Sequence, residues 1–375
     1  MKFNNQWAPA ARQSSQVDSK TIANGALPRP AASRQALRGA RKNAAAVLAA
    51  TAVLWGLGTG VAQAAEGQLR IAQQYGIVYL LLNVAQDQQL IEKHGKAQGV
   101  DIKVNYLQFS GGPAVNDALL SGNVDIAGAG VAPLFTLWDR TKGKQNVKGV
   151  ASLGNFPYYL VSNNPAVKTI ADFTDKDRIA LPAVGVSVQS RVLQLASAKL
   201  WGEKEYNRLD KLQVAVPHPD ATAAIIKGGT EINAHFGNPP FQDQALAGNP
   251  NAHIVLKSYD VLGGPASATV LYATEKFRAE SPKTYKAFVD ALDEAAKFVT
   301  ANPEKAADIY LKVSGGNTDR KLLLNIIKNP EVQFKVKPEN TLGLGQFLHR
   351  VGAIKNQPTT LKDYFFDDAL TAGGN

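Results

Sequence analysis

Short apolar runs alternate with longer segments of helical spacing along residues 68–236. The helical spacing predicts helices at 77–93, 114–120, 133–140, 188–201 and 220–227. Runs rich in β-branched residues predict strands at 69–72, 102–106, 124–127, 148–153, 179–181, 212–216 and 231–236. From Pro282 onward the pattern is helical throughout, in four segments separated by prolines and a Gly-Gly pair. Alternation of strands and helices predicts an α/β fold with parallel sheets.

The two halves of this pattern resemble one another. Residues 118–126 and 224–232 both run from a helix end through a glycine and an acidic residue into an apolar strand, at a constant offset of 106. This repetition predicts two similarly wound lobes. In such a fold the ligand is expected in the cleft between the lobes, beyond the carboxyl ends of the strands.

The first 64 residues follow a different pattern, that of a secretory signal with a long basic region. Residues 44–61 contain no charged residue, and Ala62-Gln63-Ala64 has the small residues that signal peptidase requires. We therefore expect export to the periplasm by the general secretory route, because the segment has neither an Arg-Arg pair nor a following cysteine. A membrane-spanning helix is the alternative for 44–61, since eighteen residues lie near the lower limit for crossing a bilayer.

Most of the formal net charge of the chain belongs to this leader. Residues 1–43 hold eight basic residues and one acid, so they account for +7 of the formal net charge of +10. The remaining +3 is spread over 65–375 with acids and bases interspersed, which argues against nucleic-acid binding. The chain has no cysteine, which excludes disulfides and thiol catalysis. The 311 residues after the leader exceed the usual size of a single core, so two domains are expected.

Glycines and small polar residues gather at the predicted junctions between strands and helices. Helix N-termini at such junctions present unpaired N–H groups and favour anions, and glycine permits close backbone approach. His235 and Asn238 come from the matching strand end and turn of the second lobe. The predicted ligand-binding residues are Gln74, Tyr75, Gly76, Ser110, Gly111, Gly112, Gly130, Val131, Ala132, Ser187, Val188, Gln189, His235 and Asn238.

Catalytic and metal-binding motifs are missing from the sequence. The segment from Gly185 to Ser187 lacks the second glycine of a nucleophile elbow, and Gly128-Ala129-Gly130 lacks the rest of a dinucleotide fingerprint. The five histidines have no metal-ligand spacing, and His235 is interpreted as a polar wall or core histidine rather than a base. We therefore predict no catalytic residue, no metal and no cofactor.

At these junctions the sequence resembles a known family. Phe109-x-x-Gly112-Pro113, followed by the segment 118–130 with its three glycines, is similar to the core signature of the nitrate, taurine and aliphatic-sulfonate ABC solute-binding proteins. Segments 169–173 and 220–234 are similar to the second-lobe part of that family, so the likeness covers most of 68–300.

The resemblance implies a type II periplasmic-binding fold that closes on its ligand about two crossover strands. It implies a receptor that delivers a small, anionic solute to ABC permease and ATPase subunits in the inner membrane; we expect a monomer and no enzymatic activity. The expected division is lobe I at 65–156, lobe II at 157–270, and a helical segment at 271–375 that packs on lobe I.

The ligand itself is left open by the sequence. The turn at 236–240 lacks the acid that many relatives have there, which argues against taurine and its ammonium group. A binding protein for a pyrimidine precursor of thiamine is the main alternative, with Tyr75, Tyr158, Tyr159 and Phe236 stacking on the ring. A pyrimidine-precursor enzyme of the same fold fits less well, because its Cys-rich motif is absent.

Overall fold

The computed structural model describes residues 66–368 and 370–374. The predicted signal, residues 1–64, lies outside this part of the chain. Across the described residues no helix has both the length and the apolar character needed to cross a membrane.

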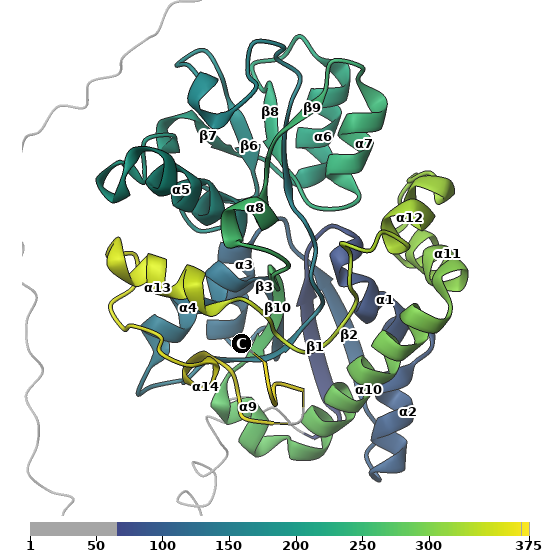
Figure 1. The fold of residues 1–375 in the computed structure, drawn as a ribbon. Helices are drawn as coiled ribbons and strands as arrows, with labels where there is room; N and C mark the ends of the chain where they lie inside the picture. Colours follow the sequence, from purple (N-terminus) through teal and green to yellow (C-terminus); the bar gives the residue numbers. More distant parts are fainter. Residues whose placement is uncertain (1–65, 369, 375) are drawn as a thin grey trace, which may run out of the picture. The chain divides into compact units, whose positions relative to one another are not determined.

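Ten strands form two five-stranded sheets of mixed direction (Figure 1). The first sheet has the order β2-β1-β3-β10-β4 and the second has the order β7-β6-β8-β5-β9. The strands are β1 (Gln68–Gln73), β2 (Lys103–Gln108), β3 (Ile126–Gly130), β4 (Lys148–Ser152), β5 (Tyr159–Ser162), β6 (Ile179–Leu181), β7 (Gln213–Ala215), β8 (Ala234–Phe236), β9 (His253–Lys257) and β10 (Thr269–Ala273).

The two sheets have the same topology. In each sheet three strands are parallel, β2-β1-β3 and β7-β6-β8, and one further strand pairs antiparallel beside the third. In the first sheet this antiparallel strand is β10, which enters after the second sheet is complete; in the second sheet it is β5, the first strand after β4. The chain therefore crosses between the sheets twice, at 153–158 and at 263–268. The α/β class and the two doubly wound lobes predicted from the sequence are confirmed.

Helices cover both faces of each sheet. Figure 1 shows α5 on one side of the second sheet and the pair α6 and α7 on the other. The α-helices are α1 (Leu80–Asp87), α2 (Leu90–Ala97), α3 (Gly112–Leu120), α4 (Val131–Thr141), α5 (Val188–Trp201), α6 (His218–Lys227), α7 (Phe241–Gly248), α8 (Ser258–Leu262), α9 (Glu275–Glu280), α10 (Pro282–Ala301), α11 (Pro303–Ser314), α12 (Arg320–Ile327), α13 (Leu342–Arg350) and α14 (Leu361–Tyr364). Short 3-10 helices are η1 (Ile77–Tyr79), η2 (Ile170–Asp172), η3 (Glu203–Glu205) and η4 (Asp210–Leu212).

The long helix α10 closes the first lobe against α1 and α2 (Figure 1). Its apolar face, including Phe288, Leu292 and Ala295, is fully buried in the main core, together with Leu69 and Ile71 of β1. Burying such side chains contributes roughly 1.5–3 kcal/mol each for the larger ones. The C-terminal part of the chain therefore belongs to the core that holds the first sheet in place.

Several predicted elements differ from those observed. The single helix predicted at 77–93 is interrupted at Gln88 and Gln89, where Gln89 has a left-handed φ of 51°. The strands β5, β9 and β10 and the helix α7 were not predicted. β10 is buried at every position, so it has none of the alternation that marks a half-buried strand.

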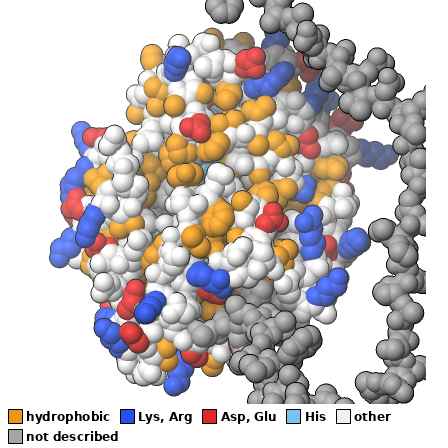
Figure 2. Space-filling model, turned by 180° about the vertical axis from the view of Figure 1, so that it is seen from behind, with side chains coloured by type: hydrophobic (Ala, Val, Ile, Leu, Met, Phe, Trp, Pro, Cys, Tyr) orange, Lys and Arg blue, Asp and Glu red, His pale blue; other side chains and the backbone are white. Residues whose placement is uncertain are grey.

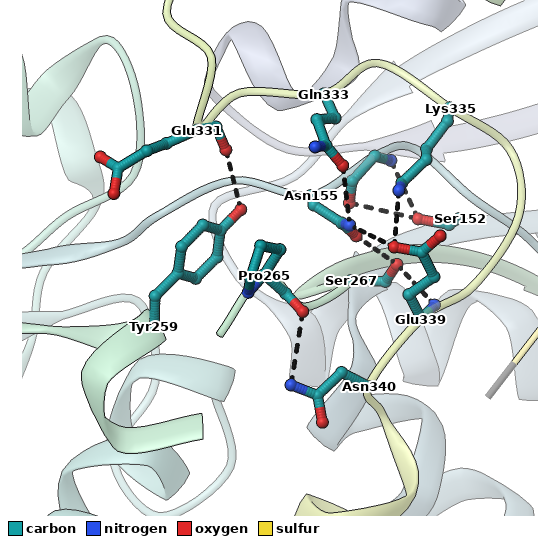
Figure 3. Close-up of polar contacts among 11 residues, drawn as sticks. Ser152, Asn155, Tyr259, Pro265, Ser267, Glu331, Gln333, Lys335, Glu339 and Asn340 are labelled. Carbon is teal, nitrogen blue, oxygen red and sulfur yellow. Dashed lines mark hydrogen bonds and ion pairs between the residues drawn. The ribbon is translucent and has the colours of Figure 1, made fainter. Parts of the chain in front are cut away.

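The C-terminal segment 331–340 binds both crossings between the sheets (Figure 3). Tyr259, just before the second crossing, donates to the Glu331 carbonyl at 3.0 Å, and the Asn340 amide donates to the Pro265 carbonyl at 3.3 Å. The Ser152 N–H, at the start of the first crossing, donates to the Val336 carbonyl at 2.8 Å.

Asn155 is the centre of the hydrogen-bond network that joins the two crossings to segment 331–340, called the hinge network below (Figure 3). It is fully buried, and its backbone exchanges two hydrogen bonds with Gln333. Its amide donates to Glu339 at 2.8 Å and accepts from the Ser267 hydroxyl at 2.8 Å, so it joins the two crossings to the C-terminal segment. Burial raises the pKa of Glu339, but hydrogen bonds from Lys335 and Asn155 outweigh it and hold that pKa below its ordinary value. The hinge is thus a satisfied polar network.

Charges of both signs are interspersed on the surface. On the face in Figure 2, blue and red side chains alternate toward the margins and hydrophobic ones gather nearer the middle. Several of the charges pair with each other, such as Lys93 with Glu294 and Arg320 with Asp308. Exposed pairs of this kind are worth little individually.

Candidate ligand-binding site

A narrow pocket lies between the two sheets, at the carboxyl ends of their parallel strands. It is lined by Gln74, Tyr75, Tyr79, Gly112, Gly130, Pro133, Tyr158, Pro182, Ser187, Val188, Gln189, His218, Asn238 and Thr269. None of these residues is an acid, a lysine or an arginine. The walls combine aromatic rings with neutral polar groups.

Four helices begin at this pocket. Gly112 and His218 are the first residues of α3 and α6, Gly130 is the N-cap of α4, and Ser187 is the N-cap of α5. The first N–H groups of an α-helix have no partner within the helix, and the helix dipole places partial positive charge there. These helix ends therefore favour a negative charge in the pocket, although its lining contains no cationic side chain.

The structure brings many of the predicted residues together at this pocket. Those that line it are Gln74, Tyr75, Gly112, Gly130, Ser187, Val188, Gln189 and Asn238. The others lie beside or behind it: Gly76, Ser110, Gly111, Val131, Ala132 and His235. Ser110 is exposed, whereas Val131 and Ala132 are buried in α4.

Gly76 and Gly111 face the opposite lobe. A Cβ atom on Gly76 would lie 2.9 Å from the Pro239 carbonyl oxygen, and one on Gly111 would lie 3.0 Å from the Pro182 carbonyl oxygen. Beside Gly76, the Ile77 N–H donates to the Pro239 carbonyl at 3.0 Å. These glycines allow the backbones of the two lobes to touch. From the sequence we had expected them to allow the backbone to approach a ligand.

Gly112 and Gly130 line the pocket, and close packing leaves little room for a side chain at either position. A Cβ atom on Gly112 would lie 2.7 Å from Cγ of Pro133, within the same lobe. One on Gly130 would lie 3.1 Å from Cβ of Val188, across the cleft. A side chain at Gly112 would therefore disturb the contact between α3 and α4, so substitution there tests packing rather than binding.

Ser187 acts as an N-cap. Its hydroxyl accepts from the Ser190 N–H at 3.3 Å and donates to the Ala183 carbonyl at 2.8 Å. Because its single proton is already committed, the donors at this end of the pocket are the first backbone N–H groups of α5, those of Val188 and Gln189.

His235 does not reach the pocket, contrary to the strand-end position expected from the sequence. It lies within β8, is fully buried, and its Nε2 is 2.8 Å from Nδ1 of His218, which does line the pocket. His218 in turn contacts Gln189. Burial lowers the pKa of both imidazoles, that of His218 to about 3, so both are neutral near pH 7.

The sequence interpretation missed several lining residues: Tyr79, Pro133, Pro182, His218 and Thr269. Tyr158, which also lines the pocket, was named only for the pyrimidine alternative. Tyr158 and Thr269 lie at the ends of the two crossings, with their hydroxyl oxygens 2.5 Å apart. Tyr79 donates to the Gly128 carbonyl at 3.2 Å. For His218 a signal was available, since Pro217-His218-Pro219 places it at the start of a helix.

Other chemistry is not apparent at this site. No group of three or more potential metal ligands is found among the described residues. The buried Asn238 uses its Nδ2 to donate to the Tyr75 carbonyl at 3.2 Å, and its Oδ1 has no partner. The site offers neutral hydrogen-bonding groups and aligned backbone amides, which suit binding.

Two sheets of identical topology, joined by two crossings and enclosing a pocket at their strand ends, form the periplasmic-binding-protein fold. Structural comparison agrees: the alkanesulfonate-binding protein SsuA from Xanthomonas axonopodis pv. citri, bound to MOPS, matches with a TM-score of 0.59 and 19% identity. The match covers 79% of this chain and 96% of that one. The periplasmic nitrate-binding protein NrtA from Synechocystis PCC 6803 matches with a TM-score of 0.61 and 16% identity, covering 80% of this chain and 84% of that one.

The family follows from the sequence match. The model of the NMT1-like family matches residues 79–312, more than half of the chain, so the protein belongs to that family. A Brucella abortus (strain 2308) protein whose name calls it a putative binding protein is 26% identical over 302 residues. That alignment covers 77% of this chain and 86% of the relative.

Proposed function

We propose that this protein is the periplasmic receptor of an ABC importer for a small organic anion. The observation behind the proposal is that four helix N-termini converge on one pocket whose lining residues are all uncharged. In this proposal the protein delivers its solute to permease and ATPase subunits in the inner membrane, as a secreted monomer without catalytic activity. Two solved structures with the same fold, an alkanesulfonate-binding protein and a periplasmic nitrate-binding protein, support this role.

Magnitudes favour a pocket of this kind. A charge at one helix N-terminus is stabilised by roughly 0.3–2 kcal/mol, so four termini supply about 1–8 kcal/mol. Micromolar affinity requires about 8 kcal/mol. Hydrogen bonds to the ligand and the exclusion of water on closure supply the remainder. One helix terminus alone would be insufficient.

The pocket also restricts what else the anion carries. An ammonium group would be buried beside positive helix ends with no carboxylate among the lining residues, and an unpaired buried charge is costly. A neutral donor carries no such cost, and the carboxamide of Asn238, whose Oδ1 has no partner, is among the lining residues. The ligand that fits best combines an anionic oxygen group with a hydroxyl or N–H donor.

A matched series of two-carbon sulfonates tests this proposal by isothermal titration calorimetry. Isethionate, ethanesulfonate and taurine differ only in a terminal hydroxyl, hydrogen or ammonium group. We expect isethionate to bind most tightly and taurine most weakly. Binding of taurine as tight as that of isethionate would contradict the assignment, and binding of a hydroxymethylpyrimidine but of no sulfonate would favour the pyrimidine receptor. Turnover of a bound compound would contradict the receptor role.

A further inference from the structure

Three polar side chains form a chain from the pocket into the second lobe. Gln189 lines the pocket, and its amide nitrogen as placed lies 3.3 Å from Nε2 of His218. Nδ1 of His218 lies 2.8 Å from Nε2 of His235. Nδ1 of His235 is buried and has no partner. The chain therefore has one end at the ligand and a closed end in the core.

Both imidazoles are neutral, because burial lowers their pKa values. The ring of Phe241 stacks on His218 with centroids 5.7 Å apart, which adds apolar cover. A neutral imidazole has one N–H and one bare nitrogen. Each of the two contacts must therefore have a fixed donor, and the direction of one contact sets the direction of the other.

The closed end decides the direction. If Nδ1 of His235 had the proton, an N–H group would be buried with no acceptor, and buried N–H groups without a partner are rarer than unpaired acceptors. The proton of His235 then lies on Nε2 and is donated to Nδ1 of His218. His218 in turn has its proton on Nε2 and donates it to Gln189.

This direction requires the oxygen of Gln189 to face His218. The oxygen and nitrogen ends of a carboxamide have the same shape, and the hydrogen-bond network assigns them. With Oε1 turned to His218, the amide NH₂ of Gln189 faces the pocket, beside the first N–H groups of α5.

We infer that His235 and His218 are positioning residues that hold Gln189 as a hydrogen-bond donor toward an anionic oxygen of the ligand. The identity of the ligand rests on the proposed function. The series of hydrogen bonds from His235 through His218 to Gln189, called the relay below, is a property of the free protein. The relay adds a donor to the pocket without adding a charge. The relay therefore favours ligands that have a hydrogen-bond acceptor next to the amide of Gln189.

The first test reads the tautomers directly. Long-range ¹H–¹⁵N NMR spectra of the ligand-free protein, with the histidines labelled with ¹⁵N, distinguish protonated from bare ring nitrogens. The variants His218→Gln and His235→Phe assign the signals among the five histidines. We expect the Nε2–H tautomer at both positions at pH 7. An Nδ1–H tautomer or an imidazolium at either position would overturn the relay.

The second test measures binding of isethionate to variants of Gln189. Gln189→Met removes the donor without adding charge and should weaken binding about 10-fold or more, because the bond to a charged oxygen is lost. Gln189→Glu still accepts from His218 but offers no proton to the ligand, so it should weaken binding further. Gln86→Glu, on the exposed surface of α1, is the control for the added charge and should bind normally.

Two results separate the relay from the proposed function. Unchanged affinity in Gln189→Glu would overturn the inference. If the unmodified protein binds none of the sulfonates, the proposed function fails in its anion assignment, and the NMR result still decides the relay.

Discussion

Substitution of Gly111 by valine should oppose closure of the lobes without altering the separate lobes. Gly111 has φ −169° and ψ 163°, an extended conformation that valine also adopts. The tight neighbour of an added Cβ is the Pro182 carbonyl oxygen at 3.0 Å, which belongs to the loop after β6 in the opposite lobe. The two methyl groups of valine would extend this overlap. When the lobes move apart, the overlap disappears.

The expected size of the effect follows from overpacking. Extra methyl groups in a close-packed contact cost about 1–3 kcal/mol, and a cost of that size restricted to the closed form weakens ligand binding about 5- to 150-fold. Valine is also a poorer N-cap than glycine for α3, but that loss affects the free and bound forms equally and cancels in the affinity.

Isothermal titration with isethionate and thermal unfolding without ligand measure the two effects separately. The matched control is Gly343→Val, at an exposed position where an added Cβ meets nothing within 4 Å, and its affinity should equal that of the unmodified protein. An affinity for Gly111→Val that also equals the unmodified value would refute the reasoning. It would mean that the ligand is bound without the contact to Pro182.

Three other predictions concern stability. Ser187→Ala should lower the free energy of unfolding by about 1 kcal/mol through loss of the N-cap, and should change isethionate affinity little, as urea unfolding and calorimetry would reveal. Asn155→Asp should destabilise the protein by about 3–5 kcal/mol, because it places a fully buried carboxylate beside the half-buried carboxylate of Glu339; a urea midpoint close to the unmodified value would contradict the hinge network. Stability should fall as the pH decreases from about 6.5 toward 3, since His218 and His235 are neutral in the fold but protonated when unfolded, and His235→Phe should reduce this slope by about 1.4 kcal/mol per pH unit.

Local patterns in the sequence determined the parallel part of the fold. The strand β6 and the helix α5 were predicted with the bounds that the structure has, because β6 is a short apolar run that ends before Pro182 and α5 lies between an N-cap serine, Ser187, and a glycine, Gly202. The strand-to-helix junctions that line the pocket were found for the same reason: a glycine, proline or serine at a helix N-terminus is a local signal. Repetition along the chain also indicated two lobes of like topology.

Contacts between distant segments were not available from the sequence. The strands β5 and β10 are short and buried at every position, and each pairs with strands far along the chain. In addition, β10 returns to the first sheet only after the second sheet is complete. Asn155 meets Glu339 across 184 positions, and neither residue has a distinctive neighbourhood in the sequence. Such pairings depend on where the crossings place the two sheets.

The site shows the same division. The sequence by itself determined that glycines and helix N-termini would meet at one cleft, because the carboxyl ends of parallel strands share an edge. Only the tertiary structure decided that Gly111 touches Pro182 and that the Ser187 hydroxyl donates to the Ala183 carbonyl in its own loop. It also decided that His235 lies behind His218 rather than in the pocket. The physical reason is that the direction of a side chain and the partner it finds depend on the packing of both lobes, and no local pattern encodes that packing.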